Sequence, residues 1–196
     1  MVKTLLLLTL FTFSNLSFSQ NSGFEEHFYD GKSWKYNVVF LRGWKVLIDI
    51  NVKPDVSARM QSQLAYNLSL VDTKVPRKHL GYLRSIPIYI SNETTYPLRQ
   101  NEYGSLVFHH SRKWLSEYSL NPNMAISVHI INPKEVLDRH QTLGRAEYVI
   151  LHELSHSFHF YKIGVEFKPI LKAYKNAKIN SLYSHCLLYT SPSPRD

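Results

Sequence analysis

The sequence feature that most constrains the fold is a pair of histidines, His152 and His156, four residues apart. In an α-helix this spacing places the side chains one turn apart, about 6 Å along the axis, so that both imidazoles can bind one metal ion. Glu153 follows the first histidine, about 100° around the helix, where its carboxylate can reach a water molecule beside the ion. The pattern therefore predicts a helix with His152 and His156 as zinc ligands and Glu153 as a general base.

The alternative is an exposed helix on which two histidines and a glutamate are merely solvated. The neighbours of the motif are mostly apolar, namely Val149, Ile150, Leu151, Leu154 and Phe158. They predict a helix that is buried on nearly all sides. An unpaired polar group in such a helix costs about 2–7 kcal/mol by transfer data, and a bound metal would supply the missing partner.

The first nineteen residues have the pattern of a secretory signal peptide. Lys3 gives a basic start, residues 4–13 form an apolar run, and small residues precede a cleavage site at Gln20. The run is shorter than the roughly 20 residues that span a bilayer, which disfavours an uncleaved membrane anchor. We therefore expect residues 1–19 to be removed, and the mature protein to be secreted or otherwise extracytoplasmic without stable membrane insertion.

Charge and cysteine content narrow the class of protein. The formal net charge of +8 becomes +7 once Lys3, the only charged side chain of residues 1–19, is removed. The lysines and arginines are scattered rather than clustered, which favours solubility over nucleic-acid binding. Because Cys186 is the only cysteine, residues 20–185 cannot form an internal disulfide and must rely on a core, to which a metal site could add. We expect them to form one domain.

Four β-rich runs predict strands. They are residues 36–41, 44–52, 86–90 and 125–131. In the second run apolar residues alternate from Val46 to Val52 and should share one buried face. Pro87 suits an edge strand or the start of a strand. Residues 20–35 are polar and are expected to be irregular.

Helical periodicity predicts five helices. They cover residues 54–72, 77–84 and 133–140, the motif segment between Gly144 and Gly164, and residues 169–179. Pro54 suits the first turn of the first helix, and Gly164 is expected to cap the motif helix.

A long polar segment, residues 91–111, separates two of the expected strands and contains the pair His109-His110. Loops of this length are uncommon in compact domains and are often functional. We therefore predict that the segment forms a wall of the cleft, with His109 lining it. His109 and Tyr103 are the candidates for stabilising an oxyanion there.

The last residues, 186–196, do not continue the pattern of the domain. They resemble the read-through of a sequencing or cloning adapter, and the alternative is a native linker rich in serine and proline. The first interpretation predicts a non-native tail and a domain, residues 20–185, that is incomplete at its C-terminus.

The residues from about Gly43 to Tyr183 resemble a family of secreted, largely uncharacterised zinc metallopeptidases of the gluzincin type. The likeness is carried above all by residues 151–159, which contain the His-Glu-x-x-His core. Further matches are residues 43–46, 75–76, 108–115, 121–122 and 173–177. Phe108 and His110 depart from the Tyr-His-Pro sequence that is usual in the family's loop.

The resemblance implies a zincin-like α+β fold, in which a small mixed sheet packs against helices that include the His-Glu-x-x-His helix. It implies that His152 and His156 bind Zn²⁺, that Glu153 is the general base, and that a glutamate on a later helix is the third ligand. The helix expected at residues 169–179 contains no glutamate, and no later helix is expected before the tail. The chain as it stands is therefore expected to lack the third ligand and to be inactive. Glu166 is a poor substitute because it comes before the next helix.

His159 lies on the same helix face as His152 and His156, but about 4.5 Å beyond His156 along the axis. This placement favours a role in supporting the metal ligands or lining the cleft over direct ligation. A histidine of the core is the alternative. We also expect the face that carries Leu154 and Phe158 to be left partly uncovered.

The expected function is that of a secreted zinc metallopeptidase, which hydrolyses peptide bonds of a peptide or protein through a zinc-activated water. The alternative is a secreted zincin-like binding domain without catalytic activity. A third ligand in the complete gene would separate the two.

Overall fold

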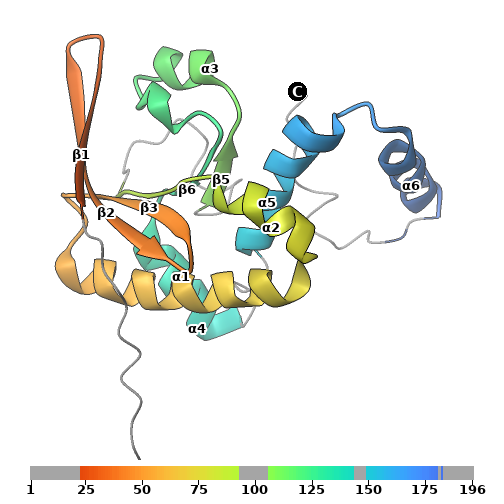
Figure 1. Cartoon of the computed structure of the whole chain (residues 1–196), viewed down its shortest axis with the longest axis horizontal. Helices are drawn as coiled ribbons and strands as arrows, with labels where there is room; N and C mark the ends of the chain where they lie inside the picture. The colour runs from red at the N-terminus through yellow and green to blue at the C-terminus, as the bar shows by residue number, and fades with distance from the viewer. Residues whose placement is uncertain (1–22, 93–105, 144–148, 181, 183–196) are drawn as a thin grey trace, which may run out of the picture.

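The structure is a computed structural model that describes residues 23–92, 106–143, 149–180 and 182. The expected signal peptide, the tail and residues 93–105 lie outside the described residues. The described chain has a mixed α+β architecture, as the sequence predicted, with a single sheet and helices on both of its faces (Figure 1).

The described strands form one mixed sheet in the order β1-β2-β3-β4-β6-β5. Their bounds are β1 Gly23–Tyr29, β2 Lys32–Leu41, β3 Trp44–Asp49, β4 Ile88–Ile90, β5 Leu106–His109 and β6 Ser127–Ile130. Strands β1, β2 and β3 form an antiparallel meander, β3, β4 and β6 run parallel, and β5 lies antiparallel to β6 at the edge.

The meander is joined by two-residue turns in the left-handed conformation that suits tight hairpins. Asp30 and Gly31 have φ angles of 48° and 72°. Arg42 and Gly43 have φ angles of 52° and 87°. The first of these turns makes residues 23–41 one long hairpin.

Six α-helices and two shorter helical turns are described. The helices are α1 Pro54–Lys74, α2 Arg77–Arg84, α3 Arg112–Glu117, α4 Pro133–Leu143, α5 Val149–Phe158 and α6 Lys168–Ile179. The turns are a 3-10 turn, η1 Pro122–Met124, and a π-helical turn, η2 His159–Ile163. Figure 1 shows α1 and α4 on one side of the sheet, α3 on the other, and α6 standing away from the sheet.

The main core lies between the sheet and helices α1, α4 and α5. Alternate residues of the central strands point to this side, because successive side chains of a strand face opposite ways. Its fully buried members include Val46, Ile88, Ile90, Val128 and Ile130 from the strands, and Met60, Leu64, Leu68 and Leu154 from the helices. Each such side chain stabilises the fold by about 1.5–3 kcal/mol through burial.

A second, smaller core covers the other face of the sheet. It contains Tyr36, Val38, Leu47, Tyr89, Leu115, Leu120 and Met124, and it packs under α3 and η1. The central strands are therefore buried on both faces, which explains why β3 carries Leu47 between Val46 and Ile48 without a polar residue.

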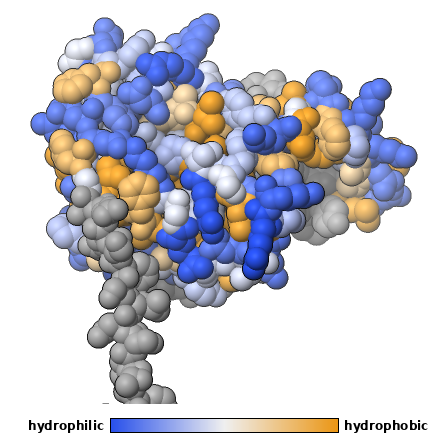
Figure 2. All heavy atoms as spheres, in the orientation of Figure 1, coloured by the Kyte–Doolittle hydropathy of each residue, from blue (hydrophilic) through white to orange (hydrophobic). Residues whose placement is uncertain are grey.

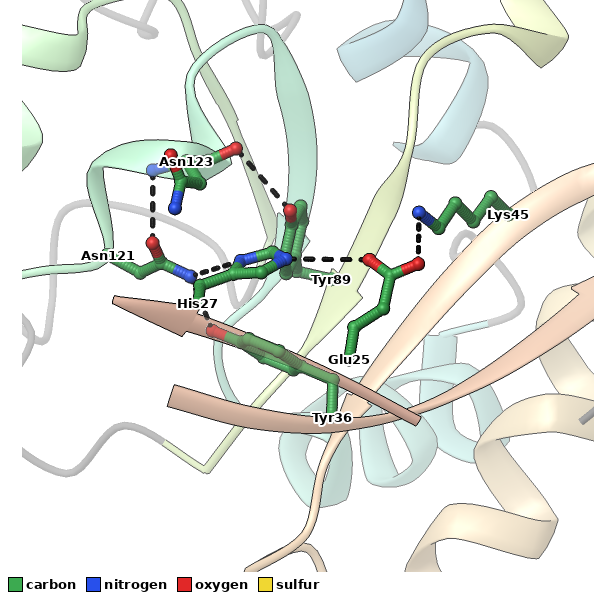
Figure 3. A network of polar contacts seen from close by, with 7 residues as sticks. All are labelled: Glu25, His27, Tyr36, Lys45, Tyr89, Asn121 and Asn123. Atoms are coloured by element: carbon green, nitrogen blue, oxygen red, sulfur yellow. Dashed lines mark hydrogen bonds and ion pairs between the residues drawn. The ribbon is translucent and has the colours of Figure 1, made fainter. Parts of the chain in front are cut away.

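A polar network ties the first hairpin to η1 on this second face (Figure 3). The Nδ2 of Asn121 donates to His27 Nδ1 at 2.9 Å and to the Tyr36 hydroxyl at 3.0 Å. Glu25 joins the network through His27 Nε2, 3.5 Å away, and through Lys45 Nζ, 2.6 Å away. Asn121 is fully buried, so these bonds satisfy polar atoms that water cannot reach.

Most of the predicted helices are confirmed. The helices at residues 54–72, 77–84, 133–140 and 169–179 correspond to α1, α2, α4 and α6. None of the described helices is long and apolar enough to cross a membrane.

Helix α6 contains no buried residue. Figure 2 shows apolar and hydrophilic residues side by side over it, at the right of the view.

Other expectations were wrong. Residues 23–35 are not irregular but form β1 and the start of β2, because the Asp30-Gly31 turn pairs them. Ile50 does not share the buried face of Val46 and Ile48: β3 ends at Asp49, and Ile50 is 47% exposed. For Pro87 one of the two alternatives is confirmed: it directly precedes β4 and marks the start of a strand, whereas the edge alternative is excluded because β4 is a central strand.

Candidate metal centre

Helix α5 carries the motif and packs by one face into the main core. Ile150 and Leu154, one turn apart, are almost completely buried there. The expectation of a helix buried on nearly all sides is wrong, since Ser155 is exposed and both motif histidines are only half-buried. The expectation of an uncovered face is wrong for Leu154, which is 0% exposed. The motif histidines thus lie on a helix that is anchored on one side and open on the other.

The two motif histidines converge. The Nε2 atoms of His152 and His156 are 3.1 Å apart, and their rings stand nearly perpendicular at 88°. Two nitrogens bound to one tetrahedral zinc ion by bonds of about 2.0–2.1 Å would lie roughly 3.3 Å apart. The observed separation is close to this value, so the pair fits a zinc ion with little movement.

Glu153 completes a group of three residues that can hold a metal. One ligand atom from each of His152, Glu153 and His156 lies within 4.8 Å of the others, and no second such group occurs in the described parts of the chain. Glu153 is buried, and its carboxylate accepts a hydrogen bond from the backbone N–H of Phe108 in β5. Burial raises the pKa of Glu153 to about 8, and the hydrogen bond from Phe108 opposes this shift.

Both histidines are neutral at pH 7 in the metal-free protein. Burial lowers the pKa of His152. The pKa of His156 falls to about 4, because of burial first and then the nearby imidazoles of His152 and His159. Neutral imidazole is the form that binds metal ions, so neither imidazole has to lose a proton at neutral pH.

A π-helical turn, η2, follows α5 and ends at Ile163, and the next residue, Gly164, has a φ of 81°, a positive value that favours glycine. Helix α5 itself ends at Phe158, and only together with η2 does the helical backbone end near Gly164, as expected. Contacts hold the turn against the edge strand and the residue after it: Phe160 stacks on Phe108 of β5 and on His110, and the Tyr161 hydroxyl donates to the His110 carbonyl at 3.0 Å. Strand β5 therefore borders the motif helix and its following turn.

His159 begins this turn, next to the histidine pair. Its Nε2 is buried and has no hydrogen-bond partner among the described residues. Its imidazole contributes to lowering the pKa of His156, but it is outside the group of ligand atoms within 4.8 Å of one another. The structure therefore places His159 beside the candidate centre and not among its converging ligands.

His109 does not lie at the candidate centre. Within β5, Phe108 points into the main core and faces η2, so the neighbouring side chain of His109 points to the opposite face of the sheet. There His109 Nε2 is 3.1 Å from Nδ1 of His129, and its ring lies beside Trp114. The expectation that His109 lines the cleft is corrected by this strand alternation. Tyr103 lies outside the described residues.

Glu166 is exposed in the turn before α6 and does not belong to the group of possible metal ligands. The expectation that it is poorly placed as a third ligand agrees with this position. The described residues offer two converging imidazoles and one adjacent carboxylate, but no separate third ligand.

Sequence reasoning missed two features near these residues. The backbone of Phe108 holds Glu153, and a backbone donor leaves no signal in the residue type. The buried chain Ser91–His129–His109, with 2.6 Å between Ser91 Oγ and His129 Nε2, was also missed. A histidine in the apolar run at residues 125–131 was the available signal, because a buried polar side chain needs a partner.

Comparison with protein-family models, with curated proteins and with solved structures finds no match to this chain.

Proposed function

We propose that this protein is a secreted zinc metallopeptidase with a zincin-like fold, in which residues 1–19 are a signal peptide. The observation that carries the proposal is the convergence of His152 and His156 Nε2 to 3.1 Å with Glu153 within 4.8 Å. The mixed sheet beside the motif helix supports the fold assignment, because a small mixed sheet packed against that helix is the layout that the resemblance implies.

In the proposed hydrolysis, the zinc ion and the side chains of the protein have different roles. A bound zinc ion lowers the pKa of water toward about 7 and polarises a carbonyl oxygen. His152 and His156 would hold the ion. The positive charge of a bound ion would lower the pKa of Glu153 and favour its ionised form. In that form Glu153 would take a proton from the attacking water and return it to the leaving amine of the peptide. The Phe108 N–H orients the carboxylate of Glu153 for this role.

A second candidate is a zincin-like domain that binds zinc or a partner without cleaving peptides. It is favoured by one observation, the lack of a separate third ligand among the described residues. A two-histidine site binds zinc less tightly than the three-ligand sites of zinc enzymes. The two candidates differ in activity and not in the position of the metal.

The test compares Glu153→Gln with wild type, expressed from the complete genomic reading frame and loaded with zinc. The amide keeps the shape of the side chain but cannot accept the proton, so zinc content should be retained while casein hydrolysis falls by at least about a hundredfold. Glu166→Gln, the same change at an exposed carboxylate, is the matched control and should cleave casein at the wild-type rate.

Hydrolysis of casein by Glu153→Gln at the wild-type rate would exclude the proposed base. A wild-type protein that binds zinc at His152 and His156 but leaves casein and a peptide library intact would select the non-catalytic candidate.

A further inference from the structure

Two buried side-chain polar atoms have no hydrogen-bond partner among the described residues: Arg84 Nε and His159 Nε2. The guanidinium of Arg84 is otherwise bound, since its Nη2 donates to Asp72 at 2.7 Å. The unpartnered nitrogen of His159 is different, because it stands next to a site that is shaped for a ligand. Buried polar atoms are nearly always paired, so such an exception indicates a missing partner.

The position of His159 indicates what kind of partner is missing. Three residues after His156, it remains on the side of the helix that carries the histidine pair. It opens a π-helical turn, a departure from α-helix that is frequent at functional sites. It is too far from the group within 4.8 Å to be one of the converging ligands, but close enough to act electrostatically on His156.

We propose that His159 Nε2 donates a hydrogen bond to an oxygen atom of the molecule that is held at the His152–His156 centre. Neutral imidazole carries one N–H, and the Nε2–H tautomer makes this nitrogen a donor. The ligand class is an acyl oxygen donor, such as a peptide carbonyl, a carboxylate or a hydroxamate. His159 is then a binding residue for the substrate and not a ligand of the metal. This inference rests on the metal centre of the proposed function.

The experiment uses the protein loaded with Co²⁺, whose visible absorption reports changes in coordination, and acetohydroxamate as the probe. Three substitutions of His159 are compared. His159→Leu removes the N–H donor, and His159→Asn keeps an N–H but places it closer to the backbone. His159→Gln keeps an N–H near the position of Nε2. His79→Leu is the matched control, because the His79 ring also lies at this end of α5, 4.9 Å from Phe158, but outside the centre.

Wild type and the His159 variants should bind the same amount of Co²⁺. The dissociation constant for acetohydroxamate should rise about threefold to tenfold in His159→Leu and His159→Asn, as expected for one hydrogen bond. It should stay near the wild-type value in His159→Gln and His79→Leu. If His159→Leu does not fold, the comparison of His159→Asn with wild type is sufficient for the test.

Unchanged acetohydroxamate binding in both loss variants would overturn the inference and leave His159 as a residue of the core. If these variants lose as much Co²⁺ as His152→Ala does, His159 is a metal ligand. That result would also overturn the inference that His159 binds the substrate. Absence of Co²⁺ binding in wild type would refute the metal centre itself, which separates failure of the proposed function from failure of this inference.

Discussion

The Nε2 atoms of His152 and His156 lie 3.1 Å apart across one turn of α5. Two neutral imidazole nitrogens can come this close only if the N–H of one donates a hydrogen bond to the other or if both lone pairs point at a shared ion. The half-buried position of the pair and the carboxylate of Glu153 beside it are compatible with a shared ion. The proposed function depends on this relationship more than on any other feature.

Substitution at position 154 should separate packing from chemistry in the motif helix. Leu154 is 0% exposed, and Leu154→Ala should lower the free energy of unfolding by about 2–5 kcal/mol through lost burial and a residual cavity. Ser155→Ala, at the next and exposed position, should change it by less than about 0.5 kcal/mol. Urea unfolding followed by circular dichroism measures both. Equal effects would mean that α5 does not pack as described.

The network in Figure 3 should stabilise the first hairpin through Asn121. Asn121→Ala leaves His27, the Tyr36 hydroxyl and the Asn123 N–H each without a bond that they now make. We expect a loss of about 2–4 kcal/mol, because buried polar groups left unpaired cost about 1–3 kcal/mol each and some of them can relax. Asn51→Ala is the control, since Asn51 is exposed and bonds only locally to Asp49. A similar melting temperature for both variants would contradict the described network.

The buried pair His109 and His129 should make the fold sensitive to acid. Burial lowers the pKa of His109 from 6.5 to about 3, and that of His129 well below 6.5. The nearby His110 contributes to the shift of His109, and His109 to that of His129. Below pH 6.5 the unfolded chain therefore binds protons that the folded protein does not. Stability is fully present above pH 6.5 and falls as the pH drops from 6.5 toward 3, by up to about 1.4 kcal/mol per pH unit and histidine.

Urea unfolding at pH 7.5 and 5.0 measures this dependence. His129→Gln keeps a polar side chain but cannot be protonated in this range, so the loss of stability between the two pH values should be smaller than in wild type. His152 and His156 contribute in the same direction in metal-free protein, and they are present in both forms, so the difference reports on the buried pair His109 and His129. An identical pH dependence in wild type and variant would show that His129 titrates normally when folded.

The sequence predicted those helices and strands whose residue pattern is contained within the element itself. Helices α1 and α2 have an apolar period of three and four residues, and prolines stand at or before their first turns, so the bounds could be read closely. The motif helix was evident from the spacing of His152 and His156. Strand β1 was missed because its polar residues hid a hairpin, although the Asp30-Gly31 pair was a usable turn signal.

The errors at the candidate site arose from tertiary structure. His109 was assigned to the cleft because it lay in a polar segment, but part of that segment is strand β5, and strand alternation turns His109 to the far face. The hydrogen bond from the backbone N–H of Phe108 to the carboxylate of Glu153 joins residues that are distant in the sequence, and it depends on how β5 packs beside α5. No local pattern encodes such a contact.

Metal content is the measurement that tests the central claim most directly. Wild type, His152→Ala, His156→Ala and the control His110→Ala, all expressed from the complete genomic reading frame, are dialysed against zinc and then against metal-free buffer, and zinc is measured by plasma emission. The account predicts about one zinc ion per chain in wild type and in His110→Ala, and a loss of most of it in both motif variants, because one imidazole alone binds zinc weakly. Equal zinc in all four proteins, or none in wild type, would contradict it.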